Sequence, residues 1–238
     1  MLAAGRGIRM GGDTPKTLIP IFEGRSLFDY ILSGFKREGI DDVLVVTGHR
    51  PNEVQESATR LWGEGELQFV RNARFASWGN FHSLRVAIDQ SPGMDLLVVN
   101  SDVIVTPDVY RKAVATAGDL ILGVEKKFTT DEEDMRVHLD GTRVRAISKH
   151  LKKSFSHGEF IGVSLLRTNA AAHYLEIAGE AEWRSDTGIY YEDVYDRMVG
   201  RCDVRATLFE PGRYAEVDTP QDVAVAASVI AANPGTWE

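Results

Sequence analysis

The chain has 238 residues, of which 43% are hydrophobic and 26% are charged, a composition typical of a soluble globular protein. Its formal net charge of −8 argues against duplex nucleic acid or an anionic membrane surface as a partner. Cys202 is the only cysteine, so an intrachain disulfide is excluded. No run of apolar residues is long enough to span a bilayer, and no apolar signal segment is visible, so we expect a cytoplasmic protein.

The first sixteen residues carry the strongest local pattern. They combine small residues, which let backbone N–H groups approach a polyphosphate, with cations that can neutralise phosphate oxygens. The small residues are Ala3, Ala4, Gly5 and Gly7, and the cations are Arg6, Arg9 and Lys16. This loop therefore predicts a site for a nucleoside triphosphate.

The stretch L-A-A-G-x-G-x-R-M, followed by Pro15-Lys16, resembles the signature of nucleotidyltransferases with a GT-A-type fold. Those enzymes transfer a nucleoside monophosphate from an NTP to a phosphate-bearing acceptor. We assign catalytic roles to Lys16 and Arg6, and nucleotide binding to Leu2, Ala3, Ala4, Gly5 and Gly7. Relatives usually carry several strand residues before this motif, so either the first strand is short here or the reading frame begins upstream.

The next elements are a helix, a strand and a second helix. Residues 26–38 place apolar side chains on one helical stripe, with Ser26 as a suitable N-cap and Gly39 as a suitable C-cap. Residues 43–47 form a continuous apolar run, which is typical of a strand buried on both faces. Pro51 is predicted in the first turn of the following helix.

Residues 72–84 contain Asn72 and then Trp78-Gly79-Asn80-Phe81-His82-Ser83-Leu84. This resembles the N…(W)-x-N-x-x-S-L stretch of CTP:phosphocholine cytidylyltransferases and their phosphonate and inositol-phosphate relatives. In that group the segment borders the base, which implies that Ser83 and Asn80 hydrogen-bond a pyrimidine edge. The alternative is a helix that Asn80 caps, with Ser83 in its first turn, and both interpretations stay open.

A second apolar run, residues 96–99, leads directly into Asn100-Ser101-Asp102. A carboxylate at the carboxyl end of a buried parallel strand points into the crevice where α/β sheets bind ligands. Mg²⁺ prefers hard oxygen ligands and commonly takes one or two carboxylates together with phosphates. We therefore predict that Asp102 is a metal ligand and that Ser101 lies in the nucleotide site. Pro107 is predicted in the first turn of another helix.

The pattern changes after Glu125. Residues 135–148 predict a β-hairpin with Asp140-Gly141 in a type I′ turn, and residues 160–166 form a further apolar strand. Lys149 lies nearest the return strand of this hairpin and is our choice for a contact to the acceptor phosphate. A solvated charged stretch is the alternative.

Aromatic and acidic residues then cluster in a segment similar to the choline-contacting part of the phosphocholine enzymes. The cluster comprises Trp183, Tyr190, Tyr191, Glu192, Asp193 and Tyr195. Aromatic faces with carboxylates can bind an ammonium group, so Tyr190 and Glu192 are predicted to bind the acceptor. An ordinary amphipathic helix would explain the same residues.

The last motif is Glu216-Val217-Asp218-Thr219-Pro220-Gln221-Asp222, which resembles the second acidic motif of the family. That resemblance implies that Asp218 joins Asp102 on the metal. Asp222 occupies the position of a capping-box acid, and the final helix is predicted to start at Thr219.

Strand and helix patterns alternate without a linker or repeat, which predicts an α/β fold. The expected architecture is Rossmann-like, a three-layer α/β/α arrangement around a mostly parallel mixed sheet, of the nucleotide-diphospho-sugar transferase type. We expect one domain over residues 1–238, with a nucleotide-binding half at about 1–125 and an acceptor-binding half at about 126–238.

These features predict a Mg²⁺-dependent cytidylyltransferase that transfers CMP from CTP to a small phosphorylated or phosphonylated alcohol or amine. The runner-up is a sugar-1-phosphate nucleotidyltransferase using UTP, GTP or dTTP, which usually carries an E-K-P segment where this chain reads Ala146-Ile147-Ser148-Lys149-His150. A nucleotide-binding regulatory module without turnover is the third alternative. The oligomeric state, a homodimer included, is left open.

Overall fold

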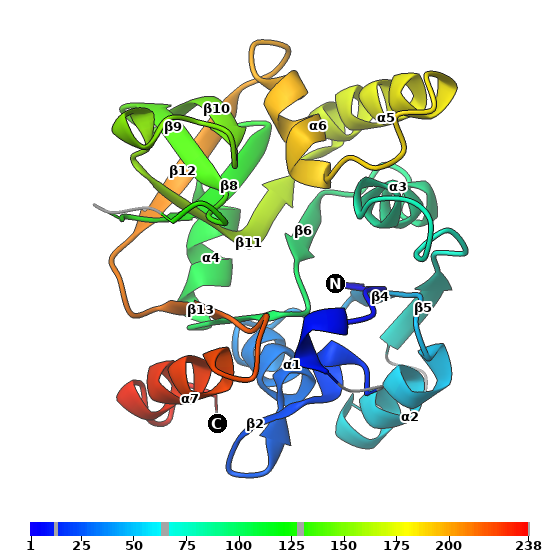
Figure 1. The fold of residues 1–238 in the computed structure, drawn as a ribbon, viewed down its shortest axis with the longest axis vertical. Coiled ribbons are helices and arrows are strands. Elements are labelled where there is room, and N and C mark those ends of the chain that lie inside the picture. Colours follow the sequence, from blue (N-terminus) through cyan, green and yellow to red (C-terminus); the bar gives the residue numbers. More distant parts are fainter. Residues whose placement is uncertain (12–13, 63–66, 128–130, 238) are drawn as a thin grey trace.

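The computed structural model describes residues 1–11, 14–62, 67–127 and 131–237. Figure 1 shows its elements in chain order. The strands are β1 (Leu2–Ala3), β2 (Pro20–Phe22), β3 (Arg25–Ser26), β4 (Val43–Thr47), β5 (Leu67–Arg71), β6 (Leu96–Val99), β7 (Val103–Val105), β8 (Leu120–Glu125), β9 (Arg136–Asp140), β10 (Arg143–Ser148), β11 (Gly158–Leu166), β12 (Val204–Phe209) and β13 (Tyr214–Glu216). The α-helices are α1 (Leu27–Arg37), α2 (Pro51–Trp62), α3 (Phe81–Gln90), α4 (Asp108–Ala115), α5 (Thr168–Trp183), α6 (Tyr191–Met198) and α7 (Asp222–Ala232). Within these ranges, none of the helices combines the length and the apolar character needed to cross a bilayer.

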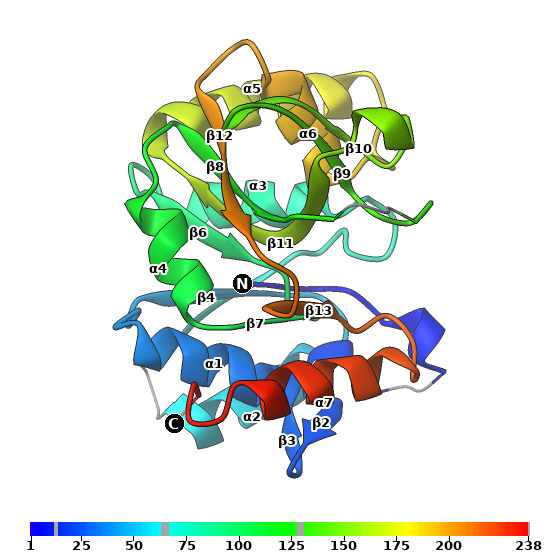
Figure 2. The same ribbon diagram turned by 90° about the vertical axis from the view of Figure 1, so that its left-hand side faces the viewer.

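Three layers result from the alternation of side chains along the buried strands. In β4, Val43 and Val45 pack into one core with α1, α2 and α4, whereas Val46 packs into the other with α3, α5 and α6. Successive strand residues point to opposite faces, so a continuous apolar run such as β4 needs helices on both sides. Figure 2 shows α1 and α2 on one side of the central strands and α3 and α5 on the other.

The sheet is mixed. Strands β1, β4 and β5 pair in parallel, and a parallel bridge from Leu2 to Asn100 connects them to the end of β6. The second sheet has the order β6-β11-β8-β12-β10-β9, in which β11 runs antiparallel to both β6 and β8 while β12 runs parallel to β8. The three-layer α/β/α class is confirmed, with more antiparallel pairing around β11 than the sequence pattern indicated.

Local signals place two helix starts correctly, those of α1 and α2. Ser26 caps α1 in a capping box with Asp29, and Gly39 follows the helix with φ +69°. Pro51 is the first residue of α2. Pro107, predicted inside a first turn, lies instead at the N-cap position of α4.

Two turn predictions need correction. The two residues between β9 and β10 are Gly141 and Thr142, and among them only Gly141 has a positive φ, +61°. A type I′ turn at Asp140-Gly141 is therefore wrong, because that turn requires positive φ at both central residues, whereas glycine at the first central position fits a type II′ turn. Helix α7 begins at Asp222, not Thr219, since the Asp222 carboxylate accepts bonds from the Asp218 and Thr219 amides in a preceding turn.

Candidate active site

The N-terminal loop is shaped by two close approaches that only glycine permits. Gly7 has φ +61°, and a Cβ there would lie 2.8 Å from Cβ of Lys16. Gly48 follows β4, and a Cβ there would lie 2.6 Å from the carbonyl oxygen of Ala4. Because glycine alone tolerates both positive φ and such contacts, the loop can fold back so that Lys16 lies beside the end of β1.

Lys16 lies between the two acids that the sequence assigned to a metal. Its ammonium donates to Asp102 Oδ2 at 3.0 Å and to Asp218 Oδ1, and Arg9 donates to Asp218 Oδ2 at 3.1 Å. Burial of Lys16 opposes its charge, but attraction to Asp102 and Asp218 outweighs it and holds the pKa of Lys16 above its ordinary value. The ammonium is therefore charged at neutral pH.

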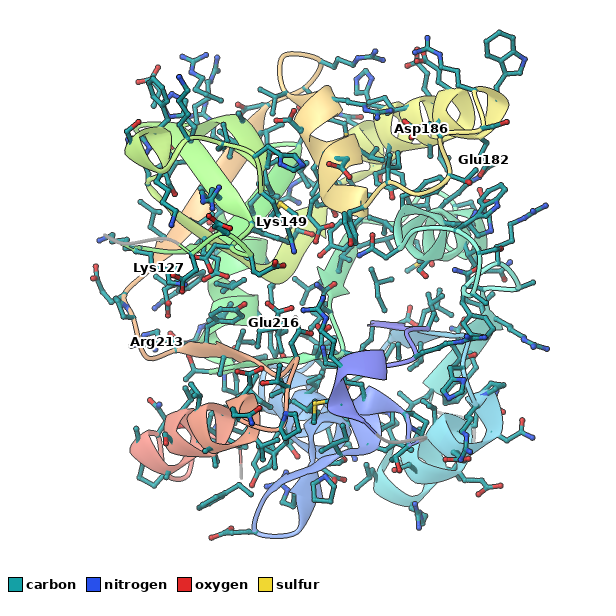
Figure 3. All side chains as sticks on the ribbon, viewed as in Figure 1. Lys127, Lys149, Glu182, Asp186, Arg213 and Glu216 are labelled. Atoms are coloured by element: carbon teal, nitrogen blue, oxygen red, sulfur yellow. The ribbon has the colours of Figure 1, made fainter. Side chains whose placement is uncertain are left out.

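A backbone contact explains why acids far apart in sequence meet. Strand β13 pairs antiparallel with β7, and the Val217 amide donates to the carbonyl oxygen of Asp102 at 2.9 Å. Glu216 and Asp218 flank Val217 and therefore project to the same side of the extended chain, next to the Asp102 side chain. Figure 3 shows Glu216 at the end of β13, below the loop that carries Lys149.

Glu216 is a third acid that the sequence reasoning did not assign. One carboxylate oxygen from each of Asp102, Glu216 and Asp218 lies within 4.8 Å of the others, and Oδ1 of Asp102 is buried with no hydrogen-bond partner among the described residues. Hard oxygen ligands and an unsatisfied carboxylate oxygen fit Mg²⁺. The i, i+2 spacing of Glu216 and Asp218 on a strand was the signal that could have identified the third acid.

The closeness of the three carboxylates affects the pKa of Glu216. Although part of its side chain reaches the solvent of the cleft, desolvation by the surrounding protein raises the pKa of Glu216 to about 8, and repulsion from Asp102 and Asp218 adds to the shift. A divalent cation would relieve this repulsion, because it favours the ionised form of every carboxylate near it.

Two cavities meet at these acids. The first has a volume of about 180 Å³, and all of its lining residues come from the first half of the chain, Leu2 to Asp102. The second has a volume of about 230 Å³, and its lining residues come from both halves, the first being Arg9 and the last Asp218. Both are lined by Asn80, Asn100 and Asp102. We call them the nucleotide cavity and the acceptor cavity.

The nucleotide cavity contains most of the residues that the sequence assigned to the nucleotide. These are Leu2, Ala3, Ala4, Gly5, Asn80, Ser83 and Ser101, with Lys16 at the edge shared with the acids. Gly7 is not part of the lining and instead shapes the loop. The structure does not bring Arg6 to the acids, because its guanidinium carbon lies 5.6 Å from the centre of the Phe75 ring.

The helix alternative is wrong for Asn80 as a cap and right for Ser83, which lies in the first turn of α3. Asn80 precedes α3 but makes no side-chain cap to it. Its Oδ1 accepts instead from the Tyr191 amide at the start of α6, at 2.8 Å. Ser83 is buried in the first turn of α3, where its Oγ accepts from Nδ2 of Asn72 at 2.9 Å. A hydroxyl that accepts one bond still has its O–H to donate, and Ser83 lines the nucleotide cavity.

The acceptor cavity contains Lys149, Tyr190 and Glu192. Lys149 Nζ lies 3.3 Å from Glu133 Oε2 and 5.9 Å from the centre of the Tyr190 ring. Glu192 is buried in the first turn of α6, and its Oε2 has no hydrogen-bond partner within the described ranges. Burial raises the pKa of Glu192 to about 7.

The other members of the aromatic cluster do not line this cavity. Tyr191 and Tyr195 are fully buried in the core against Phe160 and Tyr174, as the amphipathic-helix alternative predicted. Trp183 is 86% exposed at the end of α5.

The arrangement defines an α/β enzyme of the NTP transferase type, with a phosphate-binding loop, a lysine and an acidic cluster between two cavities. Residues 1–149 match the family described as MobA-like NTP transferase domain, so the chain belongs to that family and is a nucleotidyltransferase. It is 27% identical over 136 residues to the bifunctional protein GlmU of Francisella tularensis subsp. novicida (strain U112). The matched residues make up 57% of this chain and 28% of that protein. The chain thus spans about a quarter of the length of the curated relatives it matches.

Solved structures show the same fold at low sequence identity. The inositol-1-phosphate CTP transferase from T. maritima has a TM-score of 0.81 and 20% identity, covering 96% of this chain and 94% of that one. The CTP:phosphocholine cytidylyltransferase LicC from Streptococcus pneumoniae has a TM-score of 0.77 and 19% identity, covering 96% of both chains.

Proposed function

We propose that this nucleotidyltransferase transfers CMP from CTP to a small phosphorylated or phosphonylated acceptor and releases pyrophosphate, with Mg²⁺ as cofactor. The observation that carries the proposal is the position of Lys16, in contact with Asp102 and Asp218 where the two cavities meet. The nucleotide cavity is built only from residues of the proposed nucleotide-binding half, residues 1–125. The acceptor cavity adds residues from the proposed acceptor-binding half, residues 126–238.

The reaction needs alignment and charge neutralisation more than proton transfer. An oxygen of the acceptor phosphate forms a bond to the α-phosphorus while the bond from that phosphorus to the bridging oxygen breaks, and pyrophosphate leaves with the electron pair. A phosphate monoester has a second pKa near ~6, so its oxygen is already ionised at neutral pH and needs no general base. Lys16 stabilises the charge on the α-phosphate and the leaving pyrophosphate.

The three acids are the candidate ligands of the metal ion. Asp102, Glu216 and Asp218 would hold Mg²⁺, which supplies electrostatic stabilisation of the phosphate oxygens. Arg9, which contacts Asp218, is a second cation at the same edge. Arg6 remains a proposed contact to the outer phosphates, although it rests on Phe75 in this structure.

Ser83 supports a preference for cytosine. With its oxygen engaged by Asn72, the hydroxyl can act as a donor toward the base. Cytosine presents an unprotonated N3 and an oxygen on its pairing edge, whereas uracil carries a hydrogen on N3, so a hydroxyl that donates to N3 would favour cytosine over uracil.

The acceptor cavity supports an acceptor that carries an ammonium group. Glu192 is buried, and its Oε2 has no hydrogen-bond partner among the residues that the structure describes; a buried carboxylate favours a positively charged partner. The Tyr190 ring is 49% exposed at the same cavity and already has the Lys149 ammonium near its face, which is the contact a ligand ammonium would make.

A substrate panel tests the proposal. The protein is incubated with Mg²⁺, one of CTP, UTP, GTP or dTTP, and one of phosphocholine, phosphoethanolamine, aminoethylphosphonate or glucose 1-phosphate, and pyrophosphate release is measured. We expect selective use of CTP with an amine-bearing acceptor and loss of turnover in Asp218→Asn. Use of UTP, GTP or dTTP with the sugar phosphate would favour the sugar-1-phosphate alternative, and nucleotide binding without product would favour a regulatory module.

A further inference from the structure

Asn80 and Asn100 occupy the wall between the nucleotide cavity and the acceptor cavity. Both residues line both cavities, although Asn80 precedes α3 and Asn100 follows β6. Asn100 also lies beside the proposed metal ligand Asp102. A side chain in this position can reach a group that spans the two cavities, which is where the reacting phosphates meet.

One buried tyrosine holds both carboxamides by their oxygens. The Tyr191 amide donates to Asn80 Oδ1 at 2.8 Å, and the Tyr191 hydroxyl donates to Asn100 Oδ1 at 2.9 Å. Tyr191 is fully buried in the first turn of α6 and packs against Phe160 and Tyr195. Its position is therefore fixed by the core rather than by a ligand.

This arrangement determines which way each amide group points. A carboxamide has one oxygen acceptor and one NH₂ donor, so fixing the oxygen of Asn80 or Asn100 on Tyr191 leaves the NH₂ group directed elsewhere. Neither Nδ2 atom has a hydrogen-bond partner among the residues that the structure describes, and both side chains border the cavities.

The backbone of β11 at Gly162 leaves space for the side-chain carboxamide of Asn100. Gly162 interrupts β11 with φ +70°, and a Cβ there would lie 3.0 Å from Nδ2 of Asn100. The pairing register of β11 with β8 shifts between Phe160 and Ser164, which is the mark of a β-bulge. Gly162 itself lines the acceptor cavity, so the bulge leaves the amide of Asn100 room at the cavity wall.

We infer that Asn80 and Asn100 are paired amide donors to the phosphate oxygens that meet between the two cavities, and that Tyr191 is the residue that positions them. This inference rests on the proposed nucleotidyl transfer. Neutral donors suit the place, because they bind phosphate oxygens without attracting the nearby carboxylates away from a metal. Donors that are oriented before the reaction stabilise charge that develops during it.

A comparison of two tyrosines in α6 tests the role of Tyr191. Tyr191→Phe removes the hydroxyl that holds Asn100, whereas Tyr195→Phe removes an equally buried hydroxyl whose 2.9 Å bond goes to Ser164, outside both cavities. We expect both variants to lose similar thermal stability. Only Tyr191→Phe should lower kcat, by roughly tenfold, with KM for the nucleotide nearly unchanged.

A double-mutant cycle shows whether Tyr191 acts through Asn100. Asn100→Ala should lower kcat by about 10²-fold, the scale of one lost oriented donor. Adding Tyr191→Phe to Asn100→Ala should then lower kcat no further. A kcat for Tyr191→Phe within about twofold of wild type, or effects that multiply in the double variant, would overturn the inference.

A binding measurement separates this inference from the proposed function. Side-chain amide signals of Asn80 and Asn100 in ¹⁵N spectra, assigned through Asn→Asp variants, should shift when inorganic pyrophosphate and Mg²⁺ are added. The Asn100 signal should lose that response in Tyr191→Phe but keep it in Tyr195→Phe. Absence of turnover in wild type with a normal amide response would count against the transferase proposal, whereas turnover without any amide response would count against the donor pair.

Discussion

Lys16 and Asp102 show how a buried charge can serve both stability and function. The Lys16 side chain is 12% exposed and touches two carboxylates, so its charge is compensated before any ligand arrives. The attraction outweighs the desolvation of Lys16 itself, but the two carboxylates lose hydration as well, so the placement of this cluster in a cavity wall is better explained by phosphate binding than by stability. Glu192 is the opposite case, a buried carboxylate whose Oε2 has no hydrogen-bond partner in the described part of the chain.

Removing the Lys16 ammonium should affect turnover far more than folding. In Lys16→Ala we expect kcat to fall by roughly 10²–10³-fold, because one preorganised electrostatic donor to the reacting phosphates is lost. Steady-state pyrophosphate release measures the change. Lys152→Ala, which removes an exposed lysine, is the control, and a Lys16→Ala enzyme as active as this control would remove Lys16 from the mechanism.

The raised pKa of Glu192 predicts a pH dependence in acceptor binding. Since the folded-state pKa is about 7, ionisation between pH 6 and 8 should lower KM for an amine-bearing acceptor by about tenfold. Glu192→Gln should flatten this profile. Glu133→Gln, which removes an exposed acid of the same cavity, should leave it unchanged. A profile that persists in Glu192→Gln would assign the titration to the acceptor phosphate instead.

The same shift predicts how stability changes with pH. The ordinary pKa of 4.5 applies to the unfolded chain and about 7 to the folded one, so the folded state binds more protons between these values. The stability associated with neutral Glu192 is therefore fully present below pH 4.5 and is lost as pH rises through about 7, by about 3 kcal/mol at most. Urea unfolding at pH 5 and pH 8 should show that Glu192→Gln gains stability relative to wild type only at the higher pH.

Among the elements, α6 is held by contacts that its own sequence does not reveal. Ser26 is a suitable N-cap by its residue type, and it does cap α1, in a capping box with Asp29. The alternative that Asn80 caps α3 is wrong, because its oxygen accepts from the first amide of α6, 111 positions away. Local spacing predicts local caps well, but a bond between distant segments depends on how the helices pack.

The substitution Gly79→Ala tests how firmly the loop before α6 packs on the segment before α3. The Gly79 amide donates to the carbonyl oxygen of Thr187 at 2.7 Å, and a Cβ there would lie 1.9 Å from the carbonyl oxygen of Ile189. Gly79→Ala should therefore displace the loop that carries Tyr190, lower the free energy of unfolding by about 1–3 kcal/mol and raise KM for the acceptor.

The matched control for this substitution is Gly179→Ala. Gly179 lies inside α5, where a Cβ would meet no atom within 4 Å, so alanine should leave stability unchanged or raise it by up to ~1 kcal/mol. Urea denaturation of both variants gives the comparison. Equal stability of Gly79→Ala and wild type would show that the loop can move away at no cost.

For the whole molecule, the sequence predicted the layers and the nucleotide side better than the acceptor side. The phosphate loop and Asn100-Ser101-Asp102 are two short segments that each carry a recognisable motif, and residues of both line one cavity. The acceptor cavity draws on the segment before β9 and on β11, α6 and β13, which only the tertiary fold brings together. For Glu216, the i, i+2 spacing to Asp218 was the local signal, but only the pairing of β13 with β7 brings that pair of acids to Asp102.

Nucleotide and metal should stabilise the protein jointly, because Lys16 and Arg9 offset only part of the repulsion among the three acids and a divalent cation would relieve the rest. A ligand at about 100 times its Kd adds about 2.7 kcal/mol to the free energy of unfolding, which for a chain of this size raises Tm by about 5–10 °C. We expect this rise with CTP and Mg²⁺ together, and a much smaller one with CTP and EDTA. Asp218→Asn should abolish the metal-dependent part, whereas Glu176→Gln, on the exposed surface of α5, should retain it. A full rise in Tm with CTP in EDTA would mean that Lys16 and the backbone loop bind the triphosphate without any help from the acids.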